Sequence, residues 1–518
     1  MSAGNPQRAT FMIDRAFIVR VKTHALRLVP LCASISLCCT ATPCMGAASA
    51  NTQLPNTPVG HLAGELIHHA NNDGPAQITQ WVPHVLSASM APDDKAAFVT
   101  DLASAARDSG GLDVFDVRTD PHQPGLLEVA VKGRRSAQAA LFWLTADPAH
   151  TDRLAQAVLV DMDNPFFVGW PKGSVSHAEL GKQIHAVLDK LVRVSDFSGC
   201  ITVSDGGETV FDECRGLAER SFNVPIDHQT KFHIGSIGKM FTAVAIAQLV
   251  EAGKLSWNDT LAKRVPEYPD QATAKKITVW ELLHHTAGLG DFMVPDYFEH
   301  SARFVNPADY LGLIARQPKV GEPGNGLSYS NAGYVLLGRI IENVSGESYF
   351  DYIQHHVFEP AQMTSSGFDS EDEIVPGLAV GYFHDDGVFS RTWMANWVQG
   401  IYKGSPAGGA YSTNADLLRF ANALHEGKLV KSTTIAKMFD GEVPNDGPGA
   451  IGAGIDERLS HGRHIRGHQG GIEGTTANLE MVWETGAAVA LTSNEGPSQH
   501  WLLAEEIADL LAAEGTKN

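Results

Sequence analysis

The chain has 518 residues, and its content of 43% hydrophobic and 19% charged residues is typical of a globular protein with a sizeable core. Its formal net charge at pH 7 is −20, and no run of basic residues interrupts this negative balance. Phosphate backbones and anionic membrane surfaces repel such a chain, so the charge argues against nucleic acid as a partner. The length leaves room for two or three domains.

Residues 1–50 have the pattern of a secretory signal peptide. Four basic side chains between positions 15 and 27 precede an apolar, small-residue stretch that ends in the A-x-A sequence at 48–50. We therefore expect cleavage near Ala50 and export to the periplasm or the medium. An uncleaved membrane anchor is the alternative, but Pro30 and Pro43 disfavour a spanning helix, so no stable membrane insertion is expected.

The segment 60–175 predicts a small α+β accessory domain, which follows a polar linker at 51–59. Helical patterns followed by strand patterns are typical of an antiparallel meander packed on helices, here with the order of an NTF2-like cone. No dense acid, base or metal-ligand cluster is present, so we expect this domain to bind, to position or to dimerise. The predicted helices are 60–71, 75–90 and 94–108, and the predicted strands are 112–119, 126–133, 139–146 and 154–162.

Cys200 and Cys214 are the two cysteines that lie beyond the expected leader. The sequence between them predicts a β-hairpin that turns at 205–207. With a three-residue loop at 206–208, the two cysteines would face each other across the hairpin. Export permits a disulfide between them, and two buried free thiols are an equal alternative.

The sequence Ser236-Ile237-Gly238-Lys239 places a serine and a lysine three residues apart at the start of an apolar segment. The run from Ser236 to Ala252 is apolar almost all round, which predicts a buried helix. Side chains three apart lie on one helical face, so the Lys239 amine can reach the Ser236 hydroxyl. A serine needs a neighbouring base to act as a nucleophile, and a desolvated lysine can be that base. A capping serine beside a solvated lysine is the alternative, and it fits an all-round apolar helix badly.

Two further clusters carry groups suited to proton transfer or binding. Tyr329 and Asn331 lie in the loop GEPGNGLSYSNAGY, just before an expected helix. A tyrosine near two cations can approach the phenolate form and shuttle protons, and an asparagine can hydrogen-bond a substrate amide. His468, Gly470 and Gly471 precede GTTANLEMVW, which predicts an edge strand whose glycines let a ligand approach closely. Taken singly, each cluster is equally typical of a structural turn.

Taken in this order, Ser-x-x-Lys, Tyr-x-Asn and a basic residue-x-Gly resemble the motifs of the serine β-lactamase and penicillin-binding-protein family. Similar segments of its class C β-lactamase and DD-peptidase branch match FHIGSIGKMFTAVAIAQLVEAGKL, VWELLHHTAGL, GLSYSNAGYVLLGRIIE, PAGGAYSTNADLLRFANAL and GHQGGIEGT. The resemblance covers about residues 186–513. It implies an α/β fold, a β-lactamase/DD-peptidase-like sandwich of an antiparallel sheet and a helical subdomain, with the small α+β domain in front of it.

The resemblance implies catalytic roles for three of these residues. Ser236 would be the acylated nucleophile, Lys239 its base or proton relay, and Tyr329 the second proton carrier. It implies neither a cofactor nor a metal. The pair His284–His285 matches a structural turn of the family, and no H-E-x-x-H spacing is present. Ile234, two residues before Ser236, also excludes a G-x-S-x-G nucleophile elbow.

The resemblance further implies substrate-binding roles for Asn331, His468, Gly470 and Gly471. The oxyanion hole would be the backbone N–H groups of Ser236 and Gly471. His468 stands where the true β-lactamases carry lysine, and a histidine is only partly charged near neutral pH. If His468 binds a substrate carboxylate, anionic substrates should be handled better below about pH 6.5.

We therefore expect an exported serine hydrolase that acts through an acyl-enzyme on Ser236. Its substrate would be a small molecule, an ester or a peptide, cleaved at an amide or ester bond as by a DD-peptidase, a D-aminopeptidase or an esterase. A weak β-lactamase is one alternative. A catalytically idle relative that binds peptidoglycan or peptides is another, but binding alone needs no base, so the intact Ser236, Lys239 and Tyr329 disfavour it.

Overall fold

The computed structural model describes residues 53–119, 125–134, 139–161, 170–171, 173–193, 197–384, 393–399, 401–439, 443–444, 449–496, 498 and 500–514. The expected signal peptide and its cleavage site lie outside the described residues. Within the described ranges, every helix is too short or too polar to cross a lipid bilayer.

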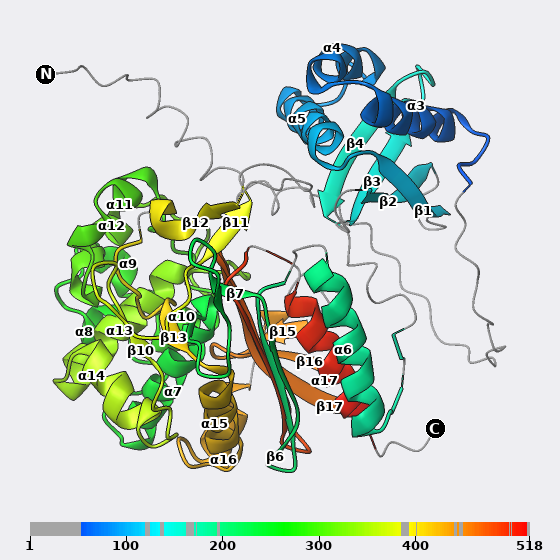
Figure 1. Cartoon of the computed structure of the whole chain (residues 1–518). Coiled ribbons are helices and arrows are strands. Elements are labelled where there is room, and N and C mark those ends of the chain that lie inside the picture. The colour runs from blue at the N-terminus through cyan, green and yellow to red at the C-terminus, as the bar shows by residue number, and fades with distance from the viewer. Residues whose placement is uncertain are drawn as a thin grey trace, which may run out of the picture.

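Three helices and a four-stranded antiparallel meander form the N-terminal unit, in the strand order β1-β2-β3-β4 (Figure 1). Their apolar side chains make one core, in which the rings of Phe98 and Phe142 meet edge to face. The first helix begins at Pro58 because the Thr57 hydroxyl caps it, accepting from the N–H of Gly60. The elements are α3 (Pro58–Asn72), α4 (Pro75–Val85), α5 (Pro92–Asp108), β1 (Leu112–Thr119), β2 (Leu126–Gly133), β3 (Ala139–Ala146) and β4 (Leu154–Asp161).

An eight-stranded antiparallel sheet organises the rest of the chain, in the order β14-β15-β16-β17-β18-β19-β5-β6. The first strands of this unit therefore pair with its last, because β5 lies beside β19. The strands are β5 (Gly199–Asp205), β6 (Glu208–Arg215), β14 (Val443–Pro444), β15 (Gly449–Ile451), β16 (Asp456–Ser460), β17 (Arg463–Ile472), β18 (Thr475–Val482) and β19 (Ala487–Ser493).

Helices cover both faces of this sheet, which makes the sandwich that the sequence predicts. On one face, α6 (His177–Arg193) and α17 (Trp501–Ala513) lie side by side over a core that includes Val489 and Leu491 (Figure 1). On the other face, Ala488 and Ala490 join the larger core of the helical subdomain. Neighbouring residues of β19 thus point to opposite faces, as the pleat of a strand requires.

The helical subdomain surrounds α7 (Gly238–Glu251), a helix that is buried almost all round. The short 3₁₀ turn η2 (Gly235–Ile237) precedes it, and α13 (Asn331–Ser345) packs beside it. The other helices are α8 (Leu261–Arg264), α9 (Gln271–Ala274), α10 (Val279–Leu283), α11 (Pro295–Glu299), α12 (Leu311–Arg316), α14 (Tyr349–Ile353), α15 (Asn414–His425) and α16 (Ser432–Met438).

Three small sheets complete the described structure. One of them joins the strand that leads into the Ser236 turn to two later strands, in the order β10-β13-β9. The strands are β7 (Leu217–Glu219), β8 (Val224–Pro225), β9 (Phe232–His233), β10 (Gly367–Phe368), β11 (Tyr382–His384), β12 (Trp393–Ala395) and β13 (Ala410–Ser412).

The hairpin of β5 and β6 confirms the predicted pairing of the cysteines and corrects the predicted loop. The loop has two residues, Gly206 and Gly207, with φ of 58° and 82°, a conformation that favours glycine. An irregularity between Val203 and Ser204 then shifts the register, so that Cys200 still lies opposite Cys214. The two form a disulfide, which decides between the alternatives that the sequence left open.

The prediction of an edge strand for the segment after His468 was wrong. Both β17 and β18 lie inside the sheet, because β17 pairs with β16 and β18, and β18 pairs with β17 and β19. The pairing of β16 with β17 ends at Asp456 opposite Gly467, however. In the described part of the chain, residues 468–472 pair with β18 alone, so this end of β17 is a local edge.

Candidate active site

Ser236 lies in the turn η2, with its backbone packed directly against the local edge of β17. Gly235 has a φ of 49°, and a Cβ there would lie 2.9 Å from the nitrogen of Gly471. A Cβ on Gly470 would lie 2.0 Å from the oxygen of Ile234 and 3.0 Å from the nitrogen of Ser236. Glycine at 235 and 470 therefore lets the two backbones approach more closely than any side chain would allow.

Lys239, one helical turn after Ser236, points its amine at the serine hydroxyl. Its Nζ lies 3.0 Å from Ser236 Oγ, 2.9 Å from Asn331 Oδ1 and 2.6 Å from the carbonyl oxygen of Ala407. Its side chain is fully buried. The spacing in the sequence thus predicts the contact correctly, and the same contact brings in Asn331 from the second motif.

Burial lowers the pKa of Lys239 from 10.5 to about 7, although the charges of Asp291 and Asp456 act in the opposite direction. Desolvation destabilises the ammonium form, and two nearby carboxylates stabilise it. A substantial fraction of Lys239 is therefore a neutral amine near pH 7. A neutral amine 3.0 Å from a hydroxyl is able to accept its proton.

Tyr329 lies beside Lys239 and is held by His285. The rings of Tyr329 and His285 stack with centroids 4.4 Å apart, and Lys239 Nζ lies 4.7 Å from the centre of the Tyr329 ring. His285 is buried, and its Nδ1 accepts a hydrogen bond from the N–H of Ser330. The expected structural role of the His284–His285 turn is consistent with this support of Tyr329.

The expectation that Tyr329 approaches the phenolate form is corrected by its surroundings. Desolvation raises the pKa of its hydroxyl, and the charges of Asp456 and Asp291 raise it further, while a hydrogen bond with Ser236 acts in the opposite direction. Because 47% of the side-chain surface is exposed, water moderates this rise. Tyr329 is therefore a neutral phenol at working pH, which is a proton donor.

Asn331 connects the lysine to a carboxylate that the sequence did not single out. Its Oδ1 accepts from Lys239, and its Nδ2 donates to Asp291 Oδ2 at 3.2 Å. Nδ2 also lies 3.6 Å from the sulfur of Met293, a weak acceptor. The Lys239–Asn331–Asp291 chain fixes which end of the amide faces the lysine. Of the two contacts of Nδ2, the one with sulfur is the weaker.

His468 is buried, and it is neutral rather than partly charged. Desolvation and the nearby charge of Lys239 lower its pKa to about 3, although a hydrogen bond from Nδ1 to the oxygen of Gln469 favours the charged form. The expectation that His468 gains a charge below pH 6.5 is therefore wrong. A single sequence shows a histidine but does not show that it is desolvated beside a lysine.

Asp291 and Asp456 are the site groups that the sequence analysis missed. Asp291 follows the HHTAGL segment on a loop, and Asp456 begins β16. Burial raises the pKa of Asp456 to about 6, against the attraction of Lys239. Gly454 shows how close this strand comes, because a Cβ on it would lie 3.1 Å from the carbonyl oxygen of Lys239. Asp291 and Asp456 lie 55 and 220 residues after Ser236 in the sequence, and neither belongs to a motif that would reveal this contact.

A possible metal-binding group lies elsewhere in the described structure. The ligating atoms of His177, Asp205 and Glu514 all lie within 4.8 Å of one another. His177 Nε2 lies 3.1 Å from Asp205 and 3.4 Å from Glu514, so the imidazole already contacts both carboxylates. All three are partly exposed, and none of them contacts the Ser236 cluster through a hydrogen bond in the described part of the chain.

The match to known proteins covers the sandwich. A sequence model of the family described as Beta-lactamase matches residues 188–513. The putative penicillin-binding protein PbpX of Bacillus subtilis is 34% identical over 243 residues, which are 47% of this chain and 59% of PbpX. Penicillin-binding protein 4* of the same organism is 29% identical over 354 residues, which are 64% of this chain and 75% of that protein.

Solved structures show the same relationship. A penicillin-binding protein from Bacillus halodurans matches with a TM-score of 0.55 and 28% identity, over 63% of this chain and 98% of its own. A D-amino acid amidase from Ochrobactrum anthropi SV3 matches with a TM-score of 0.56 and 27% identity, over 65% of this chain and 98% of its own. This chain, with its Ser-x-x-Lys helix at the junction of sheet and helices, belongs to the serine β-lactamase and penicillin-binding-protein family and is a β-lactamase-related serine hydrolase.

Proposed function

We propose that this protein is an exported hydrolase that forms an acyl-enzyme on Ser236 and cleaves an amide, peptide or ester bond. One observation carries the proposal: the amine of Lys239 lies 3.0 Å from Ser236 Oγ and has a pKa of about 7. A base that is half neutral at working pH can take the hydroxyl proton as Oγ attacks the substrate carbonyl.

The neighbouring groups supply the other parts of such a reaction. The N–H groups of Ser236 and Gly471 are placed on adjoining backbones and would bind the developing oxyanion. Tyr329, as a neutral phenol, would give its proton to the leaving amine or alcohol and recover one from Lys239. Asn331 would orient the substrate amide through Nδ2. Water would then hydrolyse the acyl-enzyme with the same base, which returns Ser236 to its free form.

The charge of the site favours some substrates over others. His468 is neutral across the working range, so it offers no positive charge to a substrate carboxylate. The groups whose charges act on Lys239 are Asp291 and Asp456, and both are negative when ionised. This balance favours amides and esters without a carboxylate beside the scissile bond. The relatives include a protein described as a D-amino acid amidase, which agrees with such substrates.

Other parts of the chain support export and a separate role for the N-terminal unit. The Cys200–Cys214 disulfide is typical of proteins that leave the reducing cytosol, in agreement with the expected signal peptide. The helices and meander between Pro58 and Asp161 carry none of the residues of the Ser236 cluster. We propose that this unit positions or binds a partner, or dimerises, rather than taking part in catalysis.

Active-site labelling tests the proposal. The wild-type protein should be labelled by a fluorophosphonate, and it should hydrolyse neutral p-nitrophenyl esters or amides faster than nitrocefin. Ser236→Ala should abolish labelling with folding intact. Lys239→Arg keeps the charge but provides no neutral amine, so labelling should slow by about two orders of magnitude. The matched control is Lys254→Arg, at an exposed lysine just after α7, which should label normally.

Three results would overturn the proposal or its substrate assignment. Normal labelling of Ser236→Ala would mean that another residue is the nucleophile. A wild-type protein that binds a fluorescent penicillin reversibly but is never acylated would instead be an idle binding relative. If nitrocefin were the best substrate, the alternative of a weak β-lactamase would replace the amide or ester assignment.

A further inference from the structure

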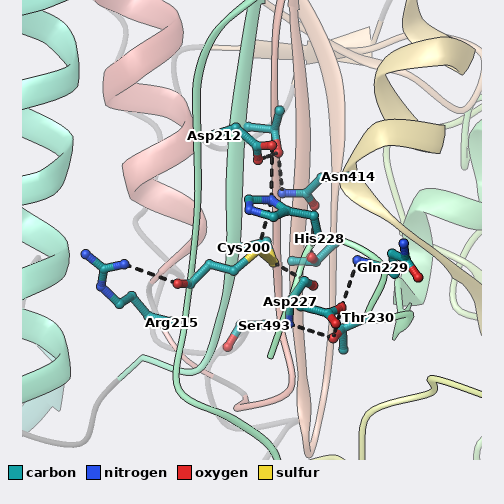
Figure 2. The surroundings of a disulfide bond; sticks show 12 residues. Cys200, Asp212, Arg215, Asp227, His228, Gln229, Thr230, Asn414 and Ser493 are labelled. Atoms are coloured by element: carbon teal, nitrogen blue, oxygen red, sulfur yellow. Dashed lines mark hydrogen bonds and ion pairs between the residues drawn. A yellow bond between two sulfur atoms is a disulfide. The ribbon is translucent and has the colours of Figure 1, made fainter. Parts of the chain in front are cut away.

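A cavity of about 240 Å³ lies at the Cys200–Cys214 disulfide, and its lining includes none of the Ser236 cluster. Both cysteines line it, together with Thr202, Asp212, His228 and Asn414. Figure 2 shows the imidazole of His228 and the turn that carries Asp227 close to the two sulfurs. Cys200 is buried, whereas Cys214 is partly exposed. A small molecule that enters this cavity therefore meets Cys214 first.

The group next to Cys200 Sγ is a hydrogen-bond acceptor, the carbonyl oxygen of Asp227, which suits a thiol better than a disulfide. Its Sγ lies 3.7 Å from the carbonyl oxygen of Asp227 (Figure 2). A disulfide sulfur has no hydrogen to donate, so this contact becomes a hydrogen bond only when Cys200 is reduced to S–H. The carbonyl is thus already in place as the acceptor for the reduced form.

The group next to Cys214 Sγ is the imidazole of His228, which suits a thiolate. Its Sγ lies 3.6 Å from Nδ1 of His228, and the same nitrogen lies 3.0 Å from Asp212 Oδ2. Asp212 is itself held by the Thr202 hydroxyl, which donates to Oδ1 at 2.8 Å. When Nδ1 carries a proton, its N–H is within reach of both the carboxylate and the sulfur. A thiolate is a far better acceptor for it than a disulfide sulfur is, so reduction strengthens this contact as well.

We propose that Cys200–Cys214 is a thiol–disulfide exchange site for small thiols that enter the cavity. The incoming thiolate attacks Cys214 Sγ, forming a mixed disulfide while the Sγ–Sγ bond breaks. Cys200 leaves and takes up the proton that the incoming thiol released, and its S–H then donates a hydrogen bond to the carbonyl oxygen of Asp227. A second thiol, as its thiolate after losing its proton to water, then attacks the sulfur of the first, which releases the oxidised small disulfide and leaves Cys214 as a thiolate beside His228. Two thiols are oxidised and one protein disulfide is reduced.

The proposal does not rest on the hydrolase function, because the cavity and the Ser236 cluster share no residue. Its test uses reduced glutathione as the probe on the folded full chain at pH 8, quenched with iodoacetamide and read by peptide mass spectrometry. A mixed disulfide on Cys214 should form first, followed by the dithiol. His228→Asn removes the N–H partner of the thiolate and should slow the second step about tenfold, as the loss of one hydrogen bond to a charged group does.

His185→Asn is the matched control. His185 lies 3.0 Å from Glu213, the neighbour of Cys214, but it is paired there with carboxylates. This variant should exchange at the wild-type rate. The proposal is overturned if exchange occurs only at the rate of global unfolding, measured on the same sample by amide hydrogen exchange. It is also overturned if His228→Asn and His185→Asn exchange equally fast. Because His228 is exposed, its replacement leaves the core intact, and circular dichroism checks this.

Discussion

At the scale of single residues, the proposed chemistry of this protein depends on keeping Lys239 out of water. The fall of its pKa from 10.5 to about 7 corresponds to about 5 kcal/mol of folding free energy. Because the folded pKa lies below the unfolded one, this cost is fully present below about pH 7 and disappears above about pH 10.5. The packing of the surrounding core offsets this cost in folding free energy. Because its pKa is lowered, Lys239 is partly a neutral amine at neutral pH.

The pH dependence of acylation should report this lysine. The neutral fraction of Lys239 grows as pH rises through about 7, so the acylation rate should rise over the same range. Asp291 raises the pKa of Lys239, and Asp291→Asn should therefore move this acid limb to lower pH. Stopped-flow labelling between pH 5 and 9 measures the limb. Asp296→Asn, at a more exposed aspartate on α11, is the control that should leave it in place. A lower rate in Asp291→Asn with an unmoved limb would contradict the electrostatic role.

Because His468 is neutral, the catalytic efficiencies for anionic and for neutral substrates should depend on pH in the same way. Its pKa of about 3 leaves it uncharged from pH 5.5 to 8.5. The ratio of catalytic efficiencies for an anionic over a neutral substrate of the same leaving group should therefore stay flat across this range. Steady-state kinetics on a matched pair of esters, with and without a carboxylate, measures it. A ratio that rises below pH 6.5 would restore a charged His468 in the binding site.

At the scale of elements, local patterns predicted most of the fold but could not predict how the elements meet. The four strands of the N-terminal meander lie within a few residues of their predictions, because their periodicity and turn residues are strong. The loop of the β5–β6 hairpin was predicted one residue too long, since a register irregularity at Val203 leaves no local signal. The interior position of β17 depends on β14–β16, which the sequence did not reveal.

The same limit applies to the candidate site. Ser236 and Lys239 could be predicted to meet because helical spacing alone brings them together. Asn331 was found through its motif, but its bond to Asp291 joins the start of α13 to a loop 40 residues earlier in the chain. The neutral state of His468 and the role of Asp456 depend on burial and on a neighbouring strand, which arise only when the sheet and α7 pack together.

Because η2 and β17 approach closely, alanine at Gly470 and alanine at Gly471 should have different effects on acylation. A Cβ on Gly470 would lie 2.0 Å from the oxygen of Ile234, whereas one on Gly471 would lie 3.8 Å from its nearest neighbour, the oxygen of Thr475. Gly470→Ala should push the Ser236 turn away and reduce acylation by about two orders of magnitude, the scale of a lost oxyanion donor. Gly471→Ala should retain most of the activity. Equal acylation rates of the two variants would show that this backbone contact does not position Ser236.

At the scale of the whole molecule, the N-terminal unit and the sandwich have separate cores. The apolar cluster around Phe98 and Phe142 shares no residue with the cores on the two faces of the large sheet. Trp170 already belongs to the core under α6 and α17. A fragment of residues 170–518 should therefore fold and be labelled by a fluorophosphonate like the full chain. Circular dichroism and labelling check this. A fragment that aggregates or labels poorly would show that the N-terminal unit completes the hydrolase.

Locating the acyl group shows directly whether this chain works through an acyl-enzyme on Ser236. The full-length protein is mixed with a p-nitrophenyl ester, acid-quenched within milliseconds, digested and analysed by mass spectrometry. An acyl-enzyme on Ser236 should give an acyl mass on the peptide that contains Ser236, formed together with the burst of nitrophenol and absent from Ser236→Ala. A burst with the acyl mass on another residue, or turnover without any covalent intermediate on Ser236, would contradict it.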